Sequence, residues 1–197
     1  MIIEHLYPER YDVRRVFIDK RGHWSMPLKK LRGLIDVAFI AIHGEYGEDG
    51  TLQAILEEAH IPFTGSGSSA SRLGMDKIAA GELFKKSRLN IPPSPTTFPL
   101  VVKPADRGSS VGVTIVKHMD ELLPAIQNAL HYSPHIMFQQ FIRGRELTCG
   151  VLEINGRATP LPPTEIIPVT SSFFDFKAKY TPGGSREITP ARIPQPI

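Results

Sequence analysis

The stretch "NIPPSPTTFP", residues 90–99, places four prolines within ten residues. Proline has no backbone N–H, and its ring clashes with the preceding turn of a helix, so no helix can run through this stretch. We therefore predict a linker here. The chain has to be organised as one set of elements before the linker and another set after it.

The residues before the linker have the pattern of an α/β unit. The segments "YDVRRVFID" (11–19) and "IDVAFIAIHG" (35–44) are predicted as strands. The second is almost continuously apolar, which is typical of a central parallel strand covered on both faces. Apolar side chains recur at helical spacing over 52–59, and 70–89 is predicted as one long helix. His43 ends the second strand, where open α/β sheets bind their ligands.

After the linker, "VVKPADRGSSVGVTIV" (101–116) has two apolar runs that are predicted as strands. Between them lies a loop of small residues, 108–112, which we call the serine loop because it contains Ser109 and Ser110. Free amides in such a loop bind anions, and Lys103 adds a positive charge nearby. The loop is neither a Walker A motif nor GxGxxG. From these residues alone, an ordinary hairpin turn remains an equal alternative.

The remaining sequence predicts a mixture of helix, strands and loop. We expect a helix within 118–132, strands at 135–142 and 145–154, and a turn at Asn155-Gly156. Residues 168–188 show little periodicity and are predicted as a long surface loop, which in a compact protein is usually functional or disordered.

Composition excludes some classes of protein. The chain has 197 residues and a net charge of +3, with basic residues scattered rather than clustered, so nucleic-acid binding is not expected. Cys149 is the one cysteine. It favours a reducing compartment and is expected to be a buried small hydrophobe rather than a nucleophile. No signal peptide or membrane span is evident, so we expect a cytoplasmic protein.

Four segments, in order, resemble the D-alanine–D-alanine ligase family. They are "HGEYGEDGTLQAILEEAHIPFTGSG" (43–67), "MDK" (75–77), "VVKPADRGSSVGV" (101–113) with "FIRGRELTCGVL" (141–152), and "FFDFKAKYTPGGS" (173–185). The resemblance implies an α/β fold of the ATP-grasp type, in which a small antiparallel sheet with helices forms the centre. It implies an N-terminal parallel α/β domain (1–75), a central ATP-grasp domain with a phosphate lid loop (76–145), and a partial C-terminal grasp domain with a mobile loop (146–197).

The resemblance also implies roles for residues that match the family's motifs. The serine loop would close over the ATP phosphates, and Lys77 and Lys103 would contact them. Glu146 would bind the ribose. Adenine would lie against Phe141, with backbone groups of Gln140 and Ile142 at its edge. The whole implied nucleotide site comprises Lys77, Lys103, Ser109, Ser110, Gln139, Gln140, Phe141, Ile142, Glu146 and Lys179.

The first D-alanine would lie near His43 and Ser109, with Glu48 orienting His43. Tyr180, at the end of the mobile loop, accompanies dipeptide-forming enzymes in the family. It therefore favours an amine as the second substrate. Lys103, Ser109, Tyr180 and His43 are the implied catalytic residues. ATP and Mg²⁺ are the implied cofactors, D-alanine is the substrate, the product is a peptidoglycan precursor, and a homodimer is possible by family analogy.

Each of these residues also has a structural alternative. Lys77 could be a solvated helix lysine, and Glu146 could pair with Arg143 or Arg145 at the surface. His43 could be a strand-end histidine whose hydrogen bond is satisfied by a carbonyl oxygen, and Tyr180 could pack against Phe174 and Phe176.

The sequence departs from the family pattern at three places. Gln139 stands where the family usually has a glutamate that faces the adenine amino group, so we expect weaker ATP binding. The family's opening strand and its metal-binding Asp, Glu and Asn have no match, so no metal ligand is assigned.

We expect a chain truncated at both ends relative to the family, with little or no ligase activity by itself. We also expect an exposed apolar edge near 148–154 and 164–169. The alternatives are a non-catalytic ATP-binding module and another ATP-grasp carboxylate–amine ligase.

Overall fold

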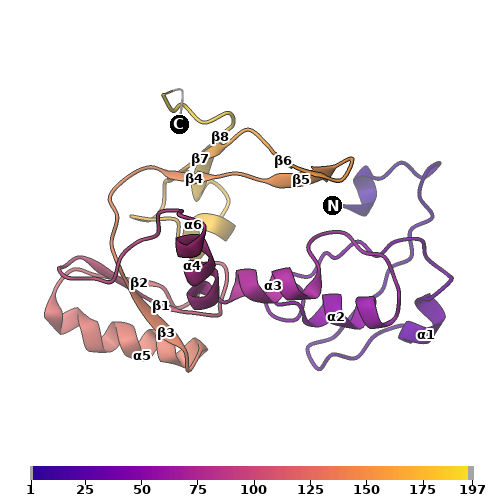
Figure 1. Ribbon diagram of the computed structural model, residues 1–197, viewed down its shortest axis with the longest axis horizontal. Coiled ribbons are helices and arrows are strands. Elements are labelled where there is room, and N and C mark those ends of the chain that lie inside the picture. The colour runs from indigo at the N-terminus through magenta and orange to yellow at the C-terminus, as the bar shows by residue number, and fades with distance from the viewer. Residues whose placement is uncertain (1, 195–197) are drawn as a thin grey trace. The chain divides into compact units, whose positions relative to one another are not determined.

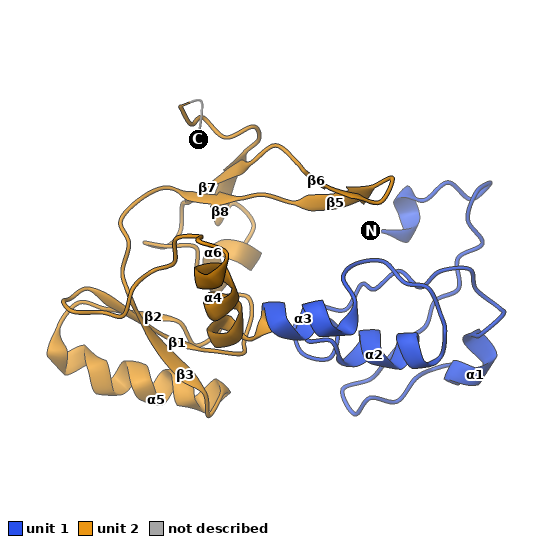
Figure 2. Cartoon of the chain, in the orientation of Figure 1, with its two compact units in different colours: residues 1–74 blue, residues 75–197 orange. Residues whose placement is uncertain are grey.

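The computed structural model describes residues 2–194 and divides the chain into two compact units, residues 1–74 and 75–197 (Figure 2). Their elements are labelled in Figure 1. The first unit contains η1 (Ile3–His5), α1 (Leu28–Leu31), α2 (Thr51–Glu58) and most of α3 (Ser68–Met75).

A small apolar core holds the first unit together. Leu31 of α1, Leu52 and Leu56 of α2, and Ile61 are nearly inaccessible to solvent and pack as one cluster. The helix predicted over 52–59 is confirmed, because α2 spans Thr51–Glu58 and turns Leu52 and Leu56 into this core. Its N-terminus follows Gly50, whose φ of 88° is a left-handed conformation that favours glycine.

The two strands predicted in the first unit are not formed as regular strands. The only pairing of 11–19 among the described residues is a single antiparallel bridge between Ile18 and Trp24. Within 35–44, a parallel bridge joins Ala38 to Phe63, while Phe39 is 61% exposed. A strand needs a hydrogen-bonded neighbour along its whole length. Within the described part of the chain, the segments 11–19 and 35–44 are paired only at single positions. The prediction that 35–44 is a strand covered on both faces was therefore wrong.

The single helix predicted over 70–89 is two helices. Residue Asp76 has an extended conformation (φ −79°, ψ 100°) and separates α3 from α4 (Lys77–Lys86). Its side chain accepts hydrogen bonds from the backbone N–H groups of Ile78 and Ala79 at 2.9 and 3.0 Å. This N-cap satisfies the free donors of the new helix start and fixes where Lys77 begins α4.

The centre of the second unit is a three-stranded antiparallel sheet in the order β2-β1-β3. Its strands are β1 (Leu100–Pro104), β2 (Thr114–Val116) and β3 (Ile136–Gln140). The short helix η2 (Met119–Glu121) leads into α5 (Leu122–Tyr132), which lies along one face of the sheet (Figure 1). Leu100, Val102 and Val116 pack there against Ala125 and Ala129. The predicted linker is irregular, and the serine loop joins β1 to β2 as predicted.

A second antiparallel sheet has the order β4-β7-β8, beside a separate β5-β6 hairpin. Their bounds are Glu146–Thr148 (β4), Val151–Ile154 (β5), Arg157–Pro160 (β6), Thr164–Pro168 (β7) and Ser185–Ile188 (β8). The predicted turn at Asn155-Gly156 closes the hairpin, with positive φ at both residues.

Two predictions in this part were wrong in detail. The strand expected over 145–154 is interrupted at Cys149-Gly150, where Cys149 is exposed rather than buried. The expected loop 168–188 contains α6 (Phe176–Tyr180) and β8. Asp175 begins α6 by accepting a hydrogen bond from the N–H of Ala178 at 2.7 Å.

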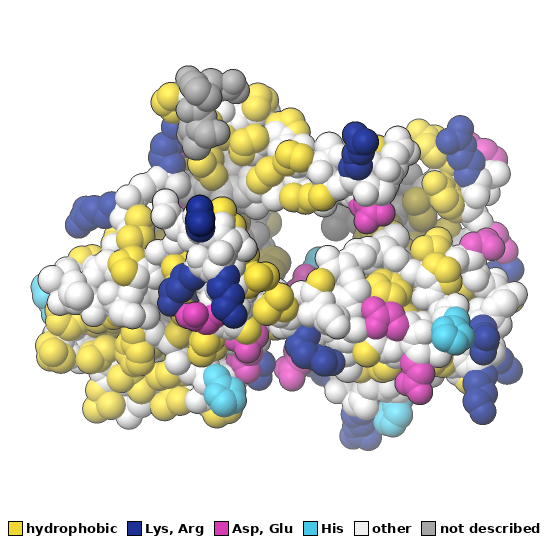
Figure 3. Space-filling model, viewed as in Figure 1, with side chains coloured by type: hydrophobic (Ala, Val, Ile, Leu, Met, Phe, Trp, Pro, Cys, Tyr) yellow, Lys and Arg dark blue, Asp and Glu magenta, His cyan; other side chains and the backbone are white. Residues whose placement is uncertain are grey.

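The expected apolar edge is present at only one of its two places. Val151, Leu152 and Ile154 of the β5-β6 hairpin are exposed, and Figure 3 shows hydrophobic side chains gathered over this hairpin. Strand β7, in contrast, lies between β4 and β8 and is not an edge. Within the described residues, no helix is both long and apolar enough to cross a membrane.

Candidate functional site

The serine loop has a backbone that few sequences adopt. Ser109, Ser110 and Gly112 have φ values of 54°, 59° and 68°, in the left-handed region that costs most side chains about 1 kcal/mol or more. An alanine Cβ at Gly112 would lie 2.8 Å from Cδ2 of Tyr132 and 2.9 Å from Cγ of Pro104. Gly112 therefore allows the loop to approach the C-terminal end of α5.

Contacts from a distant segment hold this loop. Ser109 Oγ and Tyr180 Oη share a hydrogen bond of 2.7 Å, and Ser110 Oγ donates to the carbonyl oxygen of Phe174 at 2.9 Å. The partners belong to the 173–180 segment, which carries α6. The structure thus brings the two sequence motifs, the serine loop and "FFDFKAKY", into direct contact.

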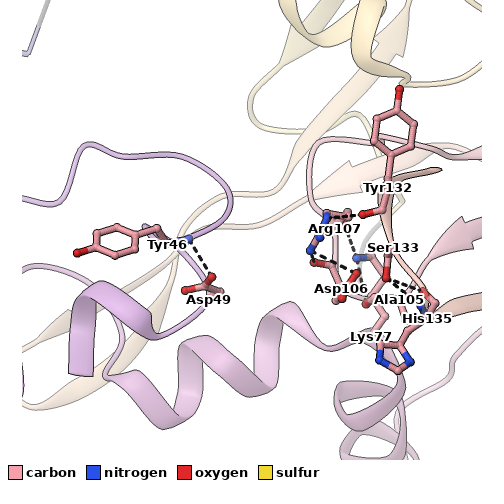
Figure 4. A network of polar contacts seen from close by, with 9 residues as sticks. All are labelled: Tyr46, Asp49, Lys77, Ala105, Asp106, Arg107, Tyr132, Ser133 and His135. Atoms are coloured by element: carbon pink, nitrogen blue, oxygen red, sulfur yellow. Dashed lines mark hydrogen bonds and ion pairs between the residues drawn. The ribbon is translucent and has the colours of Figure 1, made fainter. Parts of the chain in front are cut away.

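Lys77 and Lys103 approach each other from different elements. Lys77 begins α4, and its ammonium donates to the carbonyl oxygens of Arg107 and, at 3.5 Å, Ala105. Figure 4 shows Lys77 beside this backbone. Lys103 lies on β1 and is also half-buried. Among the described residues, its ammonium has no hydrogen-bond or ion-pair partner.

Both lysines have lowered pKa values. Burial lowers the pKa of Lys103, and the positive charge of Lys77 lowers it further. Burial is also the main cause of the lowered pKa of Lys77, where Arg107 and Lys179 act in the same direction and Asp106 and Asp76 oppose it. A site with an excess of half-buried positive charge favours an anionic ligand, which restores the charged form of each amine.

The base of the serine loop is fixed by Arg107. Its Nε donates to the carbonyl oxygen of Tyr132 at 2.9 Å, at the end of α5. Its Nη1 lies 3.5 Å from Asp106 Oδ1. Ala105 N–H donates to the carbonyl oxygen of His135 at 2.8 Å. Figure 4 shows these contacts together. The role of Arg107 was not predicted from the sequence. Its partner is a backbone carbonyl oxygen, which every residue has, so no oppositely charged residue in the sequence points to the contact.

Glu146 and Lys179 lie around Phe174. Glu146 is exposed at the start of β4, and its Oε1 accepts a hydrogen bond from the N–H of Phe174 at 3.2 Å. The Lys179 ammonium lies 5.1 Å from the centre of the Phe174 ring. Tyr180 packs against Phe176 with ring centres 4.7 Å apart, yet it remains 59% exposed. The packing alternative for Tyr180 is therefore present together with its bond to Ser109.

Glu146 does not pair with Arg145, as one alternative supposed. Arg145 instead makes two hydrogen bonds to Glu165 of β7, at 2.6 and 2.5 Å. This bond to Arg145 lowers the pKa of Glu165. The pair joins the start of β4 to β7. Sequence reasoning missed it because the two residues are 20 positions apart.

The segment expected to hold adenine ends β3. Gln140 is occupied by the linker: its N–H donates to Pro93 O at 2.9 Å, and its side-chain amide donates to Pro99 O at 2.9 Å. Phe141 N–H donates to Pro99 O at 3.3 Å. Gln139 is half-buried, and Ile142 is exposed. Of the groups expected to contact adenine, the N–H of Gln140 therefore already donates a hydrogen bond within the chain.

His43 and Glu48 belong to the first unit. His43 Nδ1 lies 3.6 Å from Glu48 Oε1, and Glu48 Oε2 accepts a hydrogen bond from the N–H of Gly44 at 2.6 Å. Glu48 is thus held beside His43, in the arrangement expected if it orients the imidazole. Asp49 stabilises the same loop. Burial alone would raise its pKa, but hydrogen bonds from the N–H groups of Tyr46 and Thr51 outweigh this and lower it.

Comparison with solved structures identifies the class of protein. One is the VanG D-Ala:D-Ser ligase from Enterococcus faecalis, with a TM-score of 0.80 and 28% identity over 98% of this chain and 71% of that one. Another is the D-alanine–D-alanine ligase from Bacillus anthracis, with a TM-score of 0.74 and 29% identity over 98% of this chain and 65% of that one. The chain has the ATP-grasp fold of these ligases.

Family models and relatives narrow the class. The model described as "D-ala D-ala ligase C-terminus" matches residues 82–197, and "D-ala D-ala ligase N-terminus" matches 27–66. The chain belongs to the D-alanine–D-alanine ligase family, which is ATP-dependent. The ligase of Geotalea uraniireducens is 44% identical over 83% of this chain, and that of Geobacter sulfurreducens is 41% identical over 98%. The chain spans 56% and 63% of their respective lengths.

Proposed function

We propose that this chain carries the nucleotide-binding part of a ligase that joins two D-alanines at the expense of ATP. The observation that carries the proposal is the pair of half-buried lysines, Lys77 and Lys103, beside the serine loop. Burial disfavours both positive charges, and Lys103 has no partner among the described residues. The phosphates of ATP supply the missing negative charge, at a site where a lower dielectric strengthens the attraction.

The remaining contacts of the nucleotide follow from the same arrangement. Ser109, Ser110 and the amides of the serine loop bind the phosphates, and Lys179 adds a third positive charge from α6. Glu146 binds the ribose hydroxyls at the start of β4. Adenine lies near the end of β3, against Phe141 and beside Gln139 and Ile142.

The reaction proceeds through an acyl phosphate. A carboxylate oxygen of the first D-alanine attacks the γ-phosphorus of ATP, and ADP leaves. The amine of the second D-alanine then attacks the acyl carbon, phosphate leaves, and the nitrogen loses a proton. The lysines stabilise charge on the transferring oxygens, and the closed serine loop keeps water from the acyl phosphate.

His43, Glu48, Ser109 and Tyr180 form the substrate-orienting part of the proposal. Glu48 holds His43 for the first D-alanine, and the hydrogen bond between Ser109 and Tyr180 joins the serine loop to α6. Because this bond links the phosphate lid loop to the mobile loop that the family resemblance implies, we propose that it belongs to the closed state of the site. Tyr180 favours an amine as the second substrate.

Magnesium is part of the family chemistry. Among residues 2–194, no three or more His, Cys, Asp and Glu side chains are grouped so as to hold a metal ion. We assign no ligand to magnesium and derive no step through the metal. A cytoplasmic location, a homodimer and a role in peptidoglycan precursor synthesis complete the proposal by analogy with the family.

Two measurements on the purified chain separate this proposal from its alternatives. ATP should raise the melting temperature of the chain, and phosphate release should be tested with D- and L-amino acids. Stabilisation by ATP without release supports the prediction that these 197 residues bind nucleotide but have little or no ligase activity alone. Release dependent on D-alanine contradicts that prediction, and release with other amines only would favour another carboxylate–amine ligase. No stabilisation by ATP contradicts nucleotide binding itself.

A further inference from the structure

Gln139 and Lys103 lie on the same face of the central sheet. The antiparallel register pairs Val101 with Gln139 and Lys103 with Met137. Residues directly opposite each other share a face, and so do residues two apart on one strand. The opposite face carries Leu100 and Val102, which pack against α5. Gln139 is thus a diagonal neighbour of Lys103, on the face that α5 leaves free.

The two neighbouring glutamines of β3 have different surroundings. The side-chain amide of Gln140 is fully used: its oxygen accepts from Thr96 N–H at 3.2 Å, and its nitrogen donates to Pro99 O at 2.9 Å and Thr97 O at 3.3 Å. Gln139 is half-buried, yet its amide makes no hydrogen bond within residues 2–194. One glutamine therefore holds the linker, and the other offers an unused donor and an unused acceptor to a ligand.

The chemistry of an amide determines what this ligand can be. A carboxylate only accepts hydrogen bonds, whereas a glutamine amide both donates and accepts, and it can rotate to exchange the two. A 6-amino purine such as adenine donates a hydrogen bond at position 6. A 6-oxo purine such as hypoxanthine or guanine accepts one there. Gln139 can satisfy either base, while a carboxylate at this position would face the 6-oxo group with two acceptors.

The proposed function places the purine beside Gln139, where the family's glutamate faces position 6 of the base. We infer that the amide of Gln139 lets this chain accept 6-oxo purine nucleotides as well as ATP. The inference rests on the proposed function, because it places the phosphates at Lys103 and the base further along the same face. It concerns the nucleotide rather than the amino acids. Inosine triphosphate (ITP) is the sharpest probe, since it has a 6-oxo group and lacks the 2-amino group of guanine.

The test compares dissociation constants for ATP and ITP, measured by isothermal titration calorimetry on the 197-residue chain. We expect the two constants of the unmodified chain to agree within about threefold, because an amide satisfies either base. Gln139→Glu should raise the ratio of the ITP to the ATP constant by about tenfold, the effect of one mismatched hydrogen bond of ~1.4 kcal/mol. Gln139→Leu should weaken both nucleotides to a similar extent.

Gln127→Glu is the matched control. It makes the same chemical change at an exposed position of α5, the helix that covers the other face of the sheet, and should leave the ratio unchanged. The inference is overturned if the unmodified chain binds ATP far more tightly than ITP, or if Gln139→Glu leaves the ratio as it was. Failure of the unmodified chain to bind either nucleotide would instead overturn the proposed function, and this inference with it.

Discussion

Lys77 and Lys103 keep their positive charges in a place that disfavours them. In the folded chain, burial holds the pKa values of both lysines below the ordinary value of 10.5. In the unfolded chain, the amines are hydrated and their pKa values return to the ordinary value. Between the folded and unfolded values, the unfolded chain binds more protons. The free energy of unfolding therefore rises as the pH rises through this alkaline window, and below the window the two charges oppose folding.

Replacing Lys103 by methionine should therefore make the chain more stable at neutral pH. The substitution should also reduce the rise in the free energy of unfolding between the folded and unfolded lysine pKa values, because one of the two amines that titrate there is removed. Urea unfolding at a series of pH values measures both effects. Lys85→Met is the control, since Lys85 is exposed and pairs with Glu82 at 2.8 Å. An equally steep rise in Lys103→Met would show that burial of this amine has no cost.

Glycine is required at one end of the serine loop but not at the other. Gly112→Ala should lower the free energy of unfolding by about 1–3 kcal/mol, because the added Cβ meets Tyr132 and Pro104 at a positive φ. Gly108→Ala should be nearly neutral, since no atom beyond Gly108 and its two chain neighbours lies within 4 Å of the place that its Cβ would occupy. Urea unfolding followed by circular dichroism compares the two. Equal losses would contradict the close approach between the loop and α5.

At the scale of elements, Asp76 decides where α4 begins. Asp76→Ala removes the acceptor of two N–H groups and should cost about 1 kcal/mol of stability. Asp76→Asn keeps an acceptor oxygen and should cost much less. The same urea experiment measures both, and a loss of the same size in the two variants would mean that the cap is not what stabilises this helix start.

Elements with a strong local signal were predictable from the sequence. The apolar spacing of α2, the Asn155-Gly156 turn and the two runs on either side of the serine loop all depend on neighbours in the chain. The break at Asp76 and the short helix α6 also have a local signal, an aspartate that caps the following N–H groups. The break at Asp76 was not predicted because the residues around it favour helix. Helix α6 was not predicted because the residues around it show no periodicity.

Features that depend on distant residues could not be predicted locally. The segment 35–44 has the composition of a buried strand, but pairing partners decide whether a strand forms, and among the described residues it is paired only by isolated bridges such as that of Ala38. The residues of the candidate site also fall into those that the sequence indicated and those that only the fold shows. Family motifs pointed to Lys77, Lys103, Glu146 and Tyr180. Arg107 and the pair of Arg145 with Glu165 emerge only when the chain is folded.

At the scale of the whole molecule, the second unit assembles its candidate site from separated parts of the sequence. Lys77 comes from the start of α4, Lys103 from β1, the serine loop from between β1 and β2, and Tyr180 from α6. The contacts between the serine loop and the 173–180 segment join the central sheet to the region of β4 and β7. This convergence of positive charge and small residues is what makes nucleotide binding the central claim.

The most direct test of that claim is the affinity of the chain for ATP when one lysine is neutralised. Isothermal titration calorimetry should show Lys103→Met binding ATP at least about tenfold more weakly than the unmodified chain, since a half-enclosed pair of charges is worth a few kcal/mol. Lys85→Met, on the exposed side of α4, should bind as the unmodified chain does. Equal affinity of all three proteins for ATP would contradict the account.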